Sequence, residues 1–121
     1  MQSNRCTPVE RWNSTAQFFA TLTENSDWVR LTPMIDLCRW AGGQDFAKDL
    51  FPLTSLHVLC VHTKPGYNPD APFFSCECTL DSSVKFVLWA EVGQQVKCSR
   101  AELTELRKEF ADYAKQLLKN S

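Results

Sequence analysis

The sequence predicts an α+β fold, with short N-terminal helices, an antiparallel meander of three to four strands and a long C-terminal helix packed on the sheet. Apolar residues recur every three or four positions near both ends of the chain and alternate at every second position in its middle. The 121 residues contain no internal repeat and fit one domain. We therefore expect a polar leader over residues 1–13, followed by a single domain over residues 14–121.

The first third of the chain predicts three short helices. Ser14 or Thr15 offers an N-cap for a helix that stops near Asn25. A second helix over residues 32–43 begins at a threonine–proline pair and ends at a glycine pair. A third short helix covers residues 44–50.

The middle of the chain predicts strands. Both alternating sets of residues 56–62 are largely apolar, which indicates an interior strand covered on both faces. Residues 63–72 hold three prolines and a glycine and form a loop. Strands over residues 74–80 and 84–92 follow, and a last short strand reaches Cys98.

The final segment predicts the long helix. Ser99-Arg-Ala-Glu102 matches a capping box, in which the serine side chain and the glutamate side chain each bind a free backbone amide. One apolar stripe then follows at spacings of three and four, formed by Leu103, Leu106, Phe110, Tyr113 and Leu117.

Two of the predicted strands carry soft metal ligands at alternating positions, Cys60-x-His62 and Cys76-x-Cys78. Each pair shares one strand face, and a hairpin would bring all four side chains together. However, Cβ atoms two residues apart on a strand are roughly 6.5–7 Å apart, whereas sulfurs on one zinc are roughly 3.8 Å apart. The thiols also alternate with apolar residues, so core packing is the preferred interpretation. We expect no cofactor, and His62 to be a capping or surface residue; a metal- or thiol-dependent protein that uses these four residues is the alternative.

Composition limits the class of protein. The formal net charge of −1 disfavours nucleic acid as the main partner, and no apolar stretch approaches the roughly 20 residues that span a bilayer. The polar start is incompatible with a secretory signal, and six scattered cysteines are too few for a disulfide scaffold, so we expect a cytoplasmic protein.

Catalysis is disfavoured because no motif supports it. Neither a Ser-His-Asp order nor a glycine-rich phosphate loop is present. Cys98, next to the predicted start of the last helix, is the best-placed nucleophile, but at that position it is equally suited to packing on Leu103.

One sheet face lies opposite the closing helix and is predicted to carry Val87, Trp89, Leu59 and Val61 among Lys85, Glu91, Glu77 and Thr79. We expect the N-terminal helices to cover this face and form a three-layer domain. In the alternative, all helices lie on one side, and the open face meets a partner or a second copy of the chain.

The sequence therefore favours a small binding module without catalysis, of the inhibitor, immunity or adaptor type. It would act on a protein partner, or by self-association, through the outer sheet face and loop 63–72. The candidate partner-binding residues are Trp89, Val87, Glu91, Lys85, Tyr67 and Asp70.

Overall fold

The computed structural model describes residues 7–120 and has the predicted α+β fold. Its α-helices are α1 (Pro8–Leu22), α2 (Thr32–Gly42) and α3 (Leu106–Asn120), and its 3₁₀ helices are η1 (Ser26–Leu31), η2 (Asp45–Asp49) and η3 (Leu103–Glu105). The strands are β1 (Phe51–Ser55), β2 (Val58–His62), β3 (Phe73–Cys78), β4 (Val84–Glu91) and β5 (Gln94–Ala101). None of the helices within residues 7–120 combines the length and apolarity needed to cross a bilayer.

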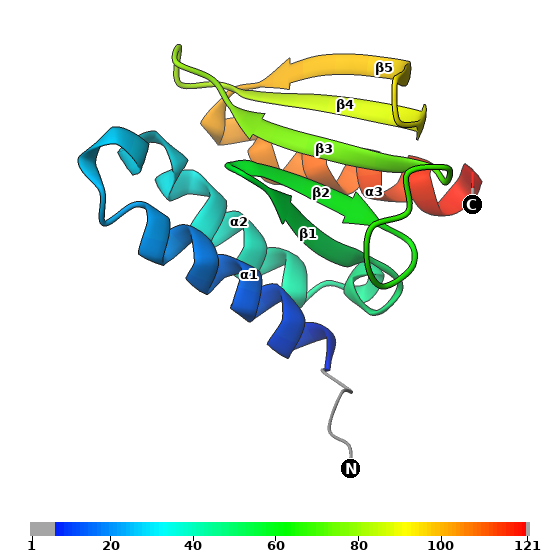
Figure 1. Ribbon diagram of the computed structural model, residues 1–121, viewed down its shortest axis with the longest axis horizontal. Coiled ribbons are helices and arrows are strands. Elements are labelled where there is room, and N and C mark those ends of the chain that lie inside the picture. The colour runs from blue at the N-terminus through cyan, green and yellow to red at the C-terminus, as the bar shows by residue number, and fades with distance from the viewer. Residues whose placement is uncertain (1–6, 121) are drawn as a thin grey trace.

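The sheet is an antiparallel meander in the order β1-β2-β3-β4-β5 (Figure 1). It has five strands rather than the predicted three to four, because residues 51–62 form a hairpin and not one strand. A two-residue turn, Leu56-His57, joins β1 to β2. Leu56 has a φ of 55°, a conformation that a leucine side chain disfavours, so the sequence carried no turn signal there.

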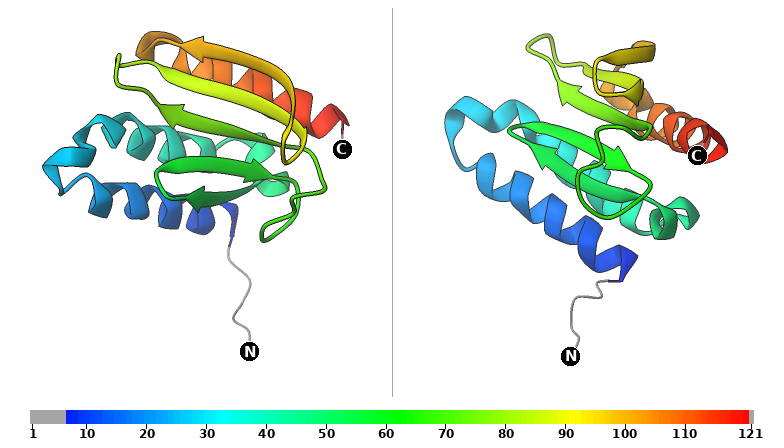
Figure 2. Two further views of the ribbon diagram at one scale, coloured as in Figure 1. Left: turned by 45° about the horizontal axis from the view of Figure 1, so that its top comes forward. Right: turned by 45° about the vertical axis from the view of Figure 1, so that its right-hand side comes forward.

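The helices all pack on one face of the sheet, which we call the inner face. Figure 1 shows α3 behind β3 to β5, and the two views in Figure 2 show α1 and α2 side by side near β1 and β2. Side chains of all three α-helices join one core, among them Phe19, Met34 and Phe110. The expected third layer is therefore wrong: the N-terminal helices bury their apolar stripes on the same side as α3, and no helix of the described chain covers the opposite, outer face.

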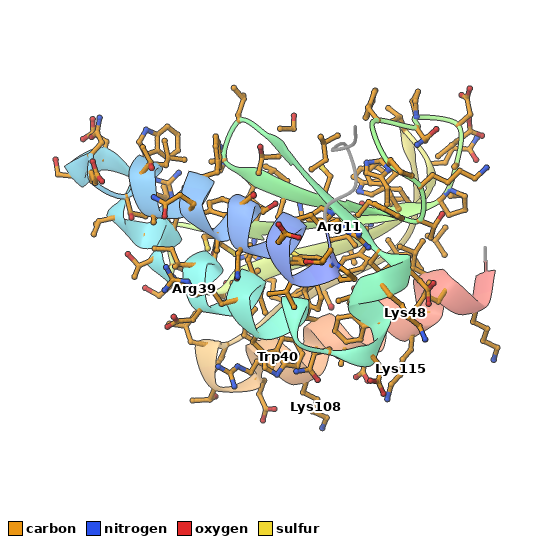
Figure 3. The ribbon with its side chains drawn as sticks, turned by 90° about the horizontal axis from the view of Figure 1, so that it is seen from below. Arg11, Arg39, Trp40, Lys48, Lys108 and Lys115 are labelled. Atoms are coloured by element: carbon orange, nitrogen blue, oxygen red, sulfur yellow. The ribbon has the colours of Figure 1, made fainter. Side chains whose placement is uncertain are left out.

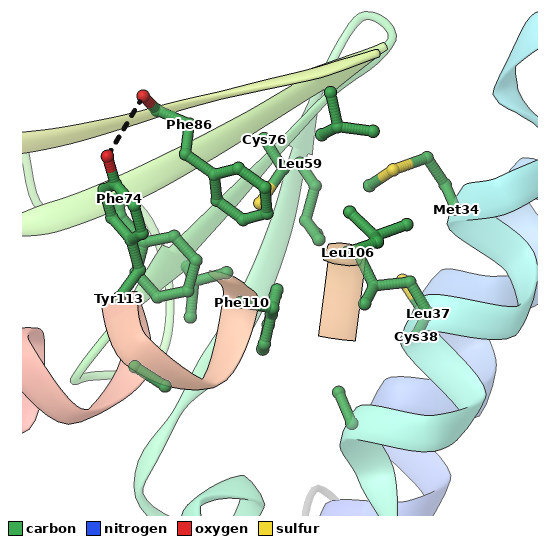
Figure 4. Packing of buried hydrophobic residues seen from close by; sticks show 14 of the residues in the cluster. Met34, Leu37, Cys38, Leu59, Phe74, Cys76, Phe86, Leu106, Phe110 and Tyr113 are labelled. Carbon is green, nitrogen blue, oxygen red and sulfur yellow. Dashed lines mark hydrogen bonds between the residues drawn. The ribbon is translucent and has the colours of Figure 1, made fainter. Parts of the chain in front are cut away.

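The core centres on aromatic rings from the sheet and α3 (Figure 4). Phe110 meets Phe74 edge to face at 5.2 Å between ring centroids, and Tyr113 stacks on Phe86 at 5.1 Å. The Tyr113 hydroxyl, inside this layer, reaches the Phe86 carbonyl oxygen at 3.5 Å. The predicted stripe of α3 is confirmed from Leu106 onward, since Leu106, Phe110, Tyr113 and Leu117 are all buried.

Helix α1 begins earlier than the sequence indicated. Thr7 and Glu10 form its capping box, in which the Thr7 side chain accepts from the Glu10 amide and the Glu10 carboxylate accepts from the Thr7 amide. Residues 8–13, part of the expected polar leader, belong to the helix, and Trp12 is fully buried. Residues 1–6 of that leader lie outside the described part of the chain.

The predicted start of the last helix is also wrong. Ser99 lies in β5 and faces inward, where its hydroxyl donates to the Glu109 carboxylate and lies 2.8 Å from the Tyr113 hydroxyl. Leu103 is exposed in η3, and Cys98 is exposed on β5. The capping-box pattern is overridden by strand pairing, because Ser99 pairs with Phe86 in the β4–β5 ladder.

Candidate functional site on the outer sheet face

A row of aromatic side chains crosses four strands of the outer face. Phe51 pairs with His62, His62 with Phe73, and Phe73 with Trp89, so the four residues stand side by side on neighbouring strands. The His62 ring stacks on Phe73 at 4.8 Å, and Phe73 stacks on Trp89 at 6.1 Å. We call these four residues the aromatic row.

A second row runs two residues further along each strand and consists of Leu53, Cys60, Ser75, Val87 and Cys98. Its side chains are smaller than those of the aromatic row, so the outer face is hollowed along this second row. The Ser75 hydroxyl accepts a hydrogen bond of 3.1 Å from the Trp89 indole N–H. This bond fixes the Trp89 ring at the rim of the hollow.

Two loops complete the walls of the hollow, which has a volume of about 580 Å³. Tyr67 projects from loop 63–72, and Val92 and Gly93 come from the turn between β4 and β5. The Val92 amide donates to the Pro69 carbonyl at 2.8 Å and so ties the loop to the turn. A volume of this size lies within the range of small-molecule pockets, about 300–1,000 Å³.

His62 lies beneath this loop and differs from its predicted role as a capping or surface residue. It is only 1% exposed, stacks on Phe73, and meets the Tyr67 ring edge to face at 6.0 Å. Neither ring nitrogen has a hydrogen-bond partner among the described residues. Burial lowers the pKa of His62 below its ordinary value of 6.5, because the charged imidazole is the form that loses solvation.

Charged side chains form a third row, Glu77, Lys85 and Arg100, of which Glu77 and Lys85 line the other end of the hollow. Glu77 pairs with His57 at 3.0 Å, and the His57 ring in turn lies 5.2 Å from that of Trp28. Arg100 pairs with Asp81 at 2.9 Å. The hollow is therefore apolar and aromatic at one end and polar at the other.

The candidate metal ligands do not converge. Cys60 and His62 point to the outer face, whereas Cys76 and Cys78 point into the core, since Cys76 pairs with Leu59 and not with Cys60. The expectation that a hairpin would bring the four side chains together is wrong, because the strand register places the two pairs on opposite faces of the sheet. Burial raises the pKa of Cys60 and that of Cys78 to about 11 and raises the pKa of Cys76 well above its ordinary value, so these thiols are protonated at neutral pH.

Four of the six candidate partner-binding residues line the hollow: Trp89, Val87, Lys85 and Tyr67. Glu91 and Asp70 do not line it; Glu91 is half-buried at the end of β4, and Asp70 is exposed in the loop. Two residues expected on this face, Leu59 and Val61, are instead fully buried in the core.

Sequence reasoning missed part of the lining, namely Leu53, Val58, Cys60, Phe73 and Ser75. Phe73 could have been predicted as a lining residue from strand alternation. It lies two residues before Ser75 and therefore shares the strand face opposite Phe74 and Cys76. Leu53 carried no comparable signal, because the β1–β2 turn was not predicted.

No family model, curated protein or solved structure matches the chain, so its function has to be argued from these residues alone.

Proposed function

We propose that the chain is a small protein-binding module without catalytic activity that acts through its outer sheet face and loop 63–72. The observation that carries the proposal is an apolar hollow of about 580 Å³ on a sheet face that no helix of the described chain covers. Exposed apolar surface that is contiguous and rimmed by polar groups marks interaction sites in soluble proteins. An inhibitor, immunity or adaptor role in the cytoplasm is the form of this proposal that fits a domain of this size.

Aromatic residues at the rim support a protein as the partner. Tyr67 is 60% exposed, and the Trp89 ring is held in place by Phe73 and Ser75. Tyrosine and tryptophan dominate the binding energy of protein interfaces, because they offer large contact areas and lose little conformational freedom. A ring that is already fixed before binding costs less to order on association.

The face is a better binding surface than either sheet edge. The edge strand β1 is short and contains Pro52, which has no amide hydrogen to donate. The other edge strand, β5, points the charged Lys97 inward over the Tyr113 ring at 4.7 Å, and its pairing with β4 shifts register near Trp89. Inward charges and bulges are the devices that stop a sheet from pairing with another chain.

Affinity capture tests the proposal. Immobilised protein is incubated with a lysate of the source cells, and retained proteins are quantified by mass spectrometry for the wild type, Tyr67→Ser, Trp89→Ser and Phe18→Ser. Phe18 is the matched control, since it is an aromatic residue 41% exposed on α1, remote from the outer face. We expect one protein in stoichiometric amount that the wild type and Phe18→Ser retain and that the other two variants lose.

Equal retention by all four proteins would contradict the proposal. Sizing chromatography supplies the other decisive outcome: a wild-type dimer that Tyr67→Ser converts to a monomer would make a second copy of the chain the occupant of this face. Trp89→Ser is compared only if its melting curve remains cooperative, because the half-buried ring also packs on Phe73.

A further inference from the structure

His62 lies in a site that suits only the neutral form of its ring. The side chain is 1% exposed, and neither ring nitrogen has a hydrogen-bond partner within residues 7–120. Phe73 stacks on the ring, and Tyr67 meets it edge to face. A protonated imidazole carries a charge and two N–H donors, and burying these without partners costs free energy.

No charged side chain of the described chain offsets this cost. The charged residues on the segments around the imidazole come from α1, η2, loop 63–72 and the end of β4; they are Arg11, Lys48, Asp49, Lys64, Asp70 and Glu91, of which Figure 3 labels Arg11 and Lys48. None of them bonds to the imidazole. Arg11 lies instead at 4.1 Å over the ring of Phe51, the β1 partner of His62, where a second positive charge is unfavourable.

The imidazole can reach water only if part of this enclosure moves. The His62 backbone is held between β1 and β3, where it pairs with Phe51 and Phe73. The Phe73 ring closes one side of the imidazole, and Tyr67 of loop 63–72 closes another. Since the strands are fixed by their pairing in the sheet, loop 63–72 is the part of the enclosure that can leave.

Loop 63–72 has few attachments to the rest of the described chain. Its three prolines have no amide hydrogen to donate. The Asn68 side chain bonds within the loop, to the carbonyl oxygens of Pro65 and Gly66. One main-chain hydrogen bond, of 2.8 Å from the Val92 amide to the Pro69 carbonyl, ties the loop to the β4–β5 turn. Segments held by so few bonds open at a free energy well below that of global unfolding.

We infer that loop 63–72 is a lid over His62 that opens when the imidazole is protonated. Opening moves Tyr67 away from the ring, breaks the bond between Val92 and Pro69, and exposes both imidazole nitrogens to water. Because Tyr67 and Val92 line the hollow, the hollow then loses one wall in acid and regains it at neutral pH. Release of a bound partner in acid rests on the proposed function, whereas the opening itself is a property of the free protein.

Hydrogen exchange of the Val92 amide measures the opening without any partner. Burial lowers the pKa of His62 in the closed state, and exposure in the open state restores its ordinary value of 6.5. The open population should therefore rise about tenfold for each pH unit below 6.5, or about thirtyfold between pH 7.5 and 5. We expect the protection factor of Val92, measured by NMR, to fall by the same ratio and to stay below that of the most protected sheet amides.

Two histidine variants assign the effect. His62→Phe keeps an aromatic ring against Phe73 and cannot titrate, so the protection factor of Val92 should be independent of pH. His57→Gln is the matched control, because His57 is the other histidine of the chain and pairs with Glu77 at the far end of the hollow. This variant should show the same fall as the wild type.

Tyr67→Ser tests the lid without altering the sheet, since the Tyr67 side chain is 60% exposed. With the cover removed, the imidazole is closer to water, and its pKa should rise toward 6.5. The Cε1–H NMR signal of His62, identified by its absence in His62→Phe, reports this titration. We expect a higher midpoint in Tyr67→Ser than in the wild type.

A protection factor of Val92 that is constant between pH 7.5 and 5, or that falls equally in His62→Phe, would overturn the inference. A Val92 amide as protected as the most protected sheet amides would also overturn it, because the loop would then open only with the whole fold. An unchanged His62 titration in Tyr67→Ser would show that Tyr67 is not the cover. These measurements contain no partner, so the lid can fail while partner capture through Tyr67 stands, and the lid can be found while capture fails.

Discussion

His62 stacks on Phe73 with the ring centroids 4.8 Å apart and the ring planes inclined by 19°. The two residues are cross-strand partners of β2 and β3 and form the centre of the aromatic row. Tyr67 covers the imidazole from loop 63–72, and the same loop is tied by Pro69 to the turn after β4. The stack therefore links the loop that rims the hollow to the sheet beneath it.

Acid should weaken the fold through His62. Burial lowers the pKa of His62 in the folded state, whereas in the unfolded chain it keeps its ordinary value of 6.5. Above that pH the imidazole is neutral in both states, and as the pH falls through 6.5 only the unfolded state binds the proton. The free energy of unfolding should then fall by up to about 1.4 kcal/mol per pH unit. Urea denaturation between pH 7.5 and 5 measures this slope.

His57→Gln is the appropriate background, since it leaves His62 as the only histidine in the chain. Adding His62→Phe, which keeps an aromatic ring against Phe73, should flatten the dependence over this range. A slope that is the same with and without His62 would show that the imidazole becomes protonated without leaving its buried site.

A methyl group at Gly42 should destabilise the protein, because it would collide with Trp12 of α1. A Cβ atom on Gly42 would lie 2.8 Å from the Trp12 Cβ, and Trp12 is fully buried in α1. We expect Gly42→Ala to cost about 1–3 kcal/mol, the range of overpacking in a tight core.

Gly43→Ala is the matched control for this prediction, measured by the same denaturation curves. A Cβ atom there meets nothing closer than the Trp40 carbonyl oxygen at 3.7 Å, so stability should change by less than about 0.5 kcal/mol. Equal effects of the two substitutions would mean that the helices are not in the described contact.

The structure and the capping-box pattern make opposite predictions for two glutamates. Ser99 bonds to Glu109 and Tyr113, so Ser99→Ala and Glu109→Ala should each cost about 1 kcal/mol. Glu102 makes no side-chain cap, so Glu102→Ala should change stability by less than about 0.5 kcal/mol. Thermal or urea melts of the three variants decide, and a large loss in Glu102→Ala with no loss in Glu109→Ala would restore the capping box.

Alternation along β3 and β4 was sufficient to predict which residues of these strands face the core. Phe74 and Cys76 on β3, and Val84, Phe86 and Leu88 on β4, alternate with the residues predicted for the outer face and are buried. On residues 56–62 the same reasoning failed, because both alternating sets are apolar and nothing in the pattern selects one face. When the two faces of a strand are assigned the wrong way round, every residue is predicted on the wrong side of the sheet. This is why Leu59 and Val61 were predicted on the outer face.

The missed elements share a physical cause, since each depends on tertiary contacts rather than on local sequence. Leu56 adopts a positive φ that no leucine would indicate, and the β1–β2 hairpin was lost with it. By its local sequence Ser99 could cap a helix, but in the structure it lies in β5, where its hydroxyl bonds to the hydroxyl of the buried Tyr113. Trp89 lines the hollow, but the other lining residues come from five further segments, whose approach to one another no local pattern indicates.

One face of the sheet is open and the other is buried, and two thiols on neighbouring strands test this difference most directly. Cys60 lies on the outer face and lines the hollow, whereas Cys76 is fully enclosed in the core. Alkylation of the native protein with N-ethylmaleimide is followed residue by residue by mass spectrometry, with the exposed Cys98 as the reference. Cys60 should react at least about tenfold faster than Cys76, whose labelling requires unfolding of the core. Equal protection of Cys60 and Cys76 would show that the outer face is covered and would contradict the account.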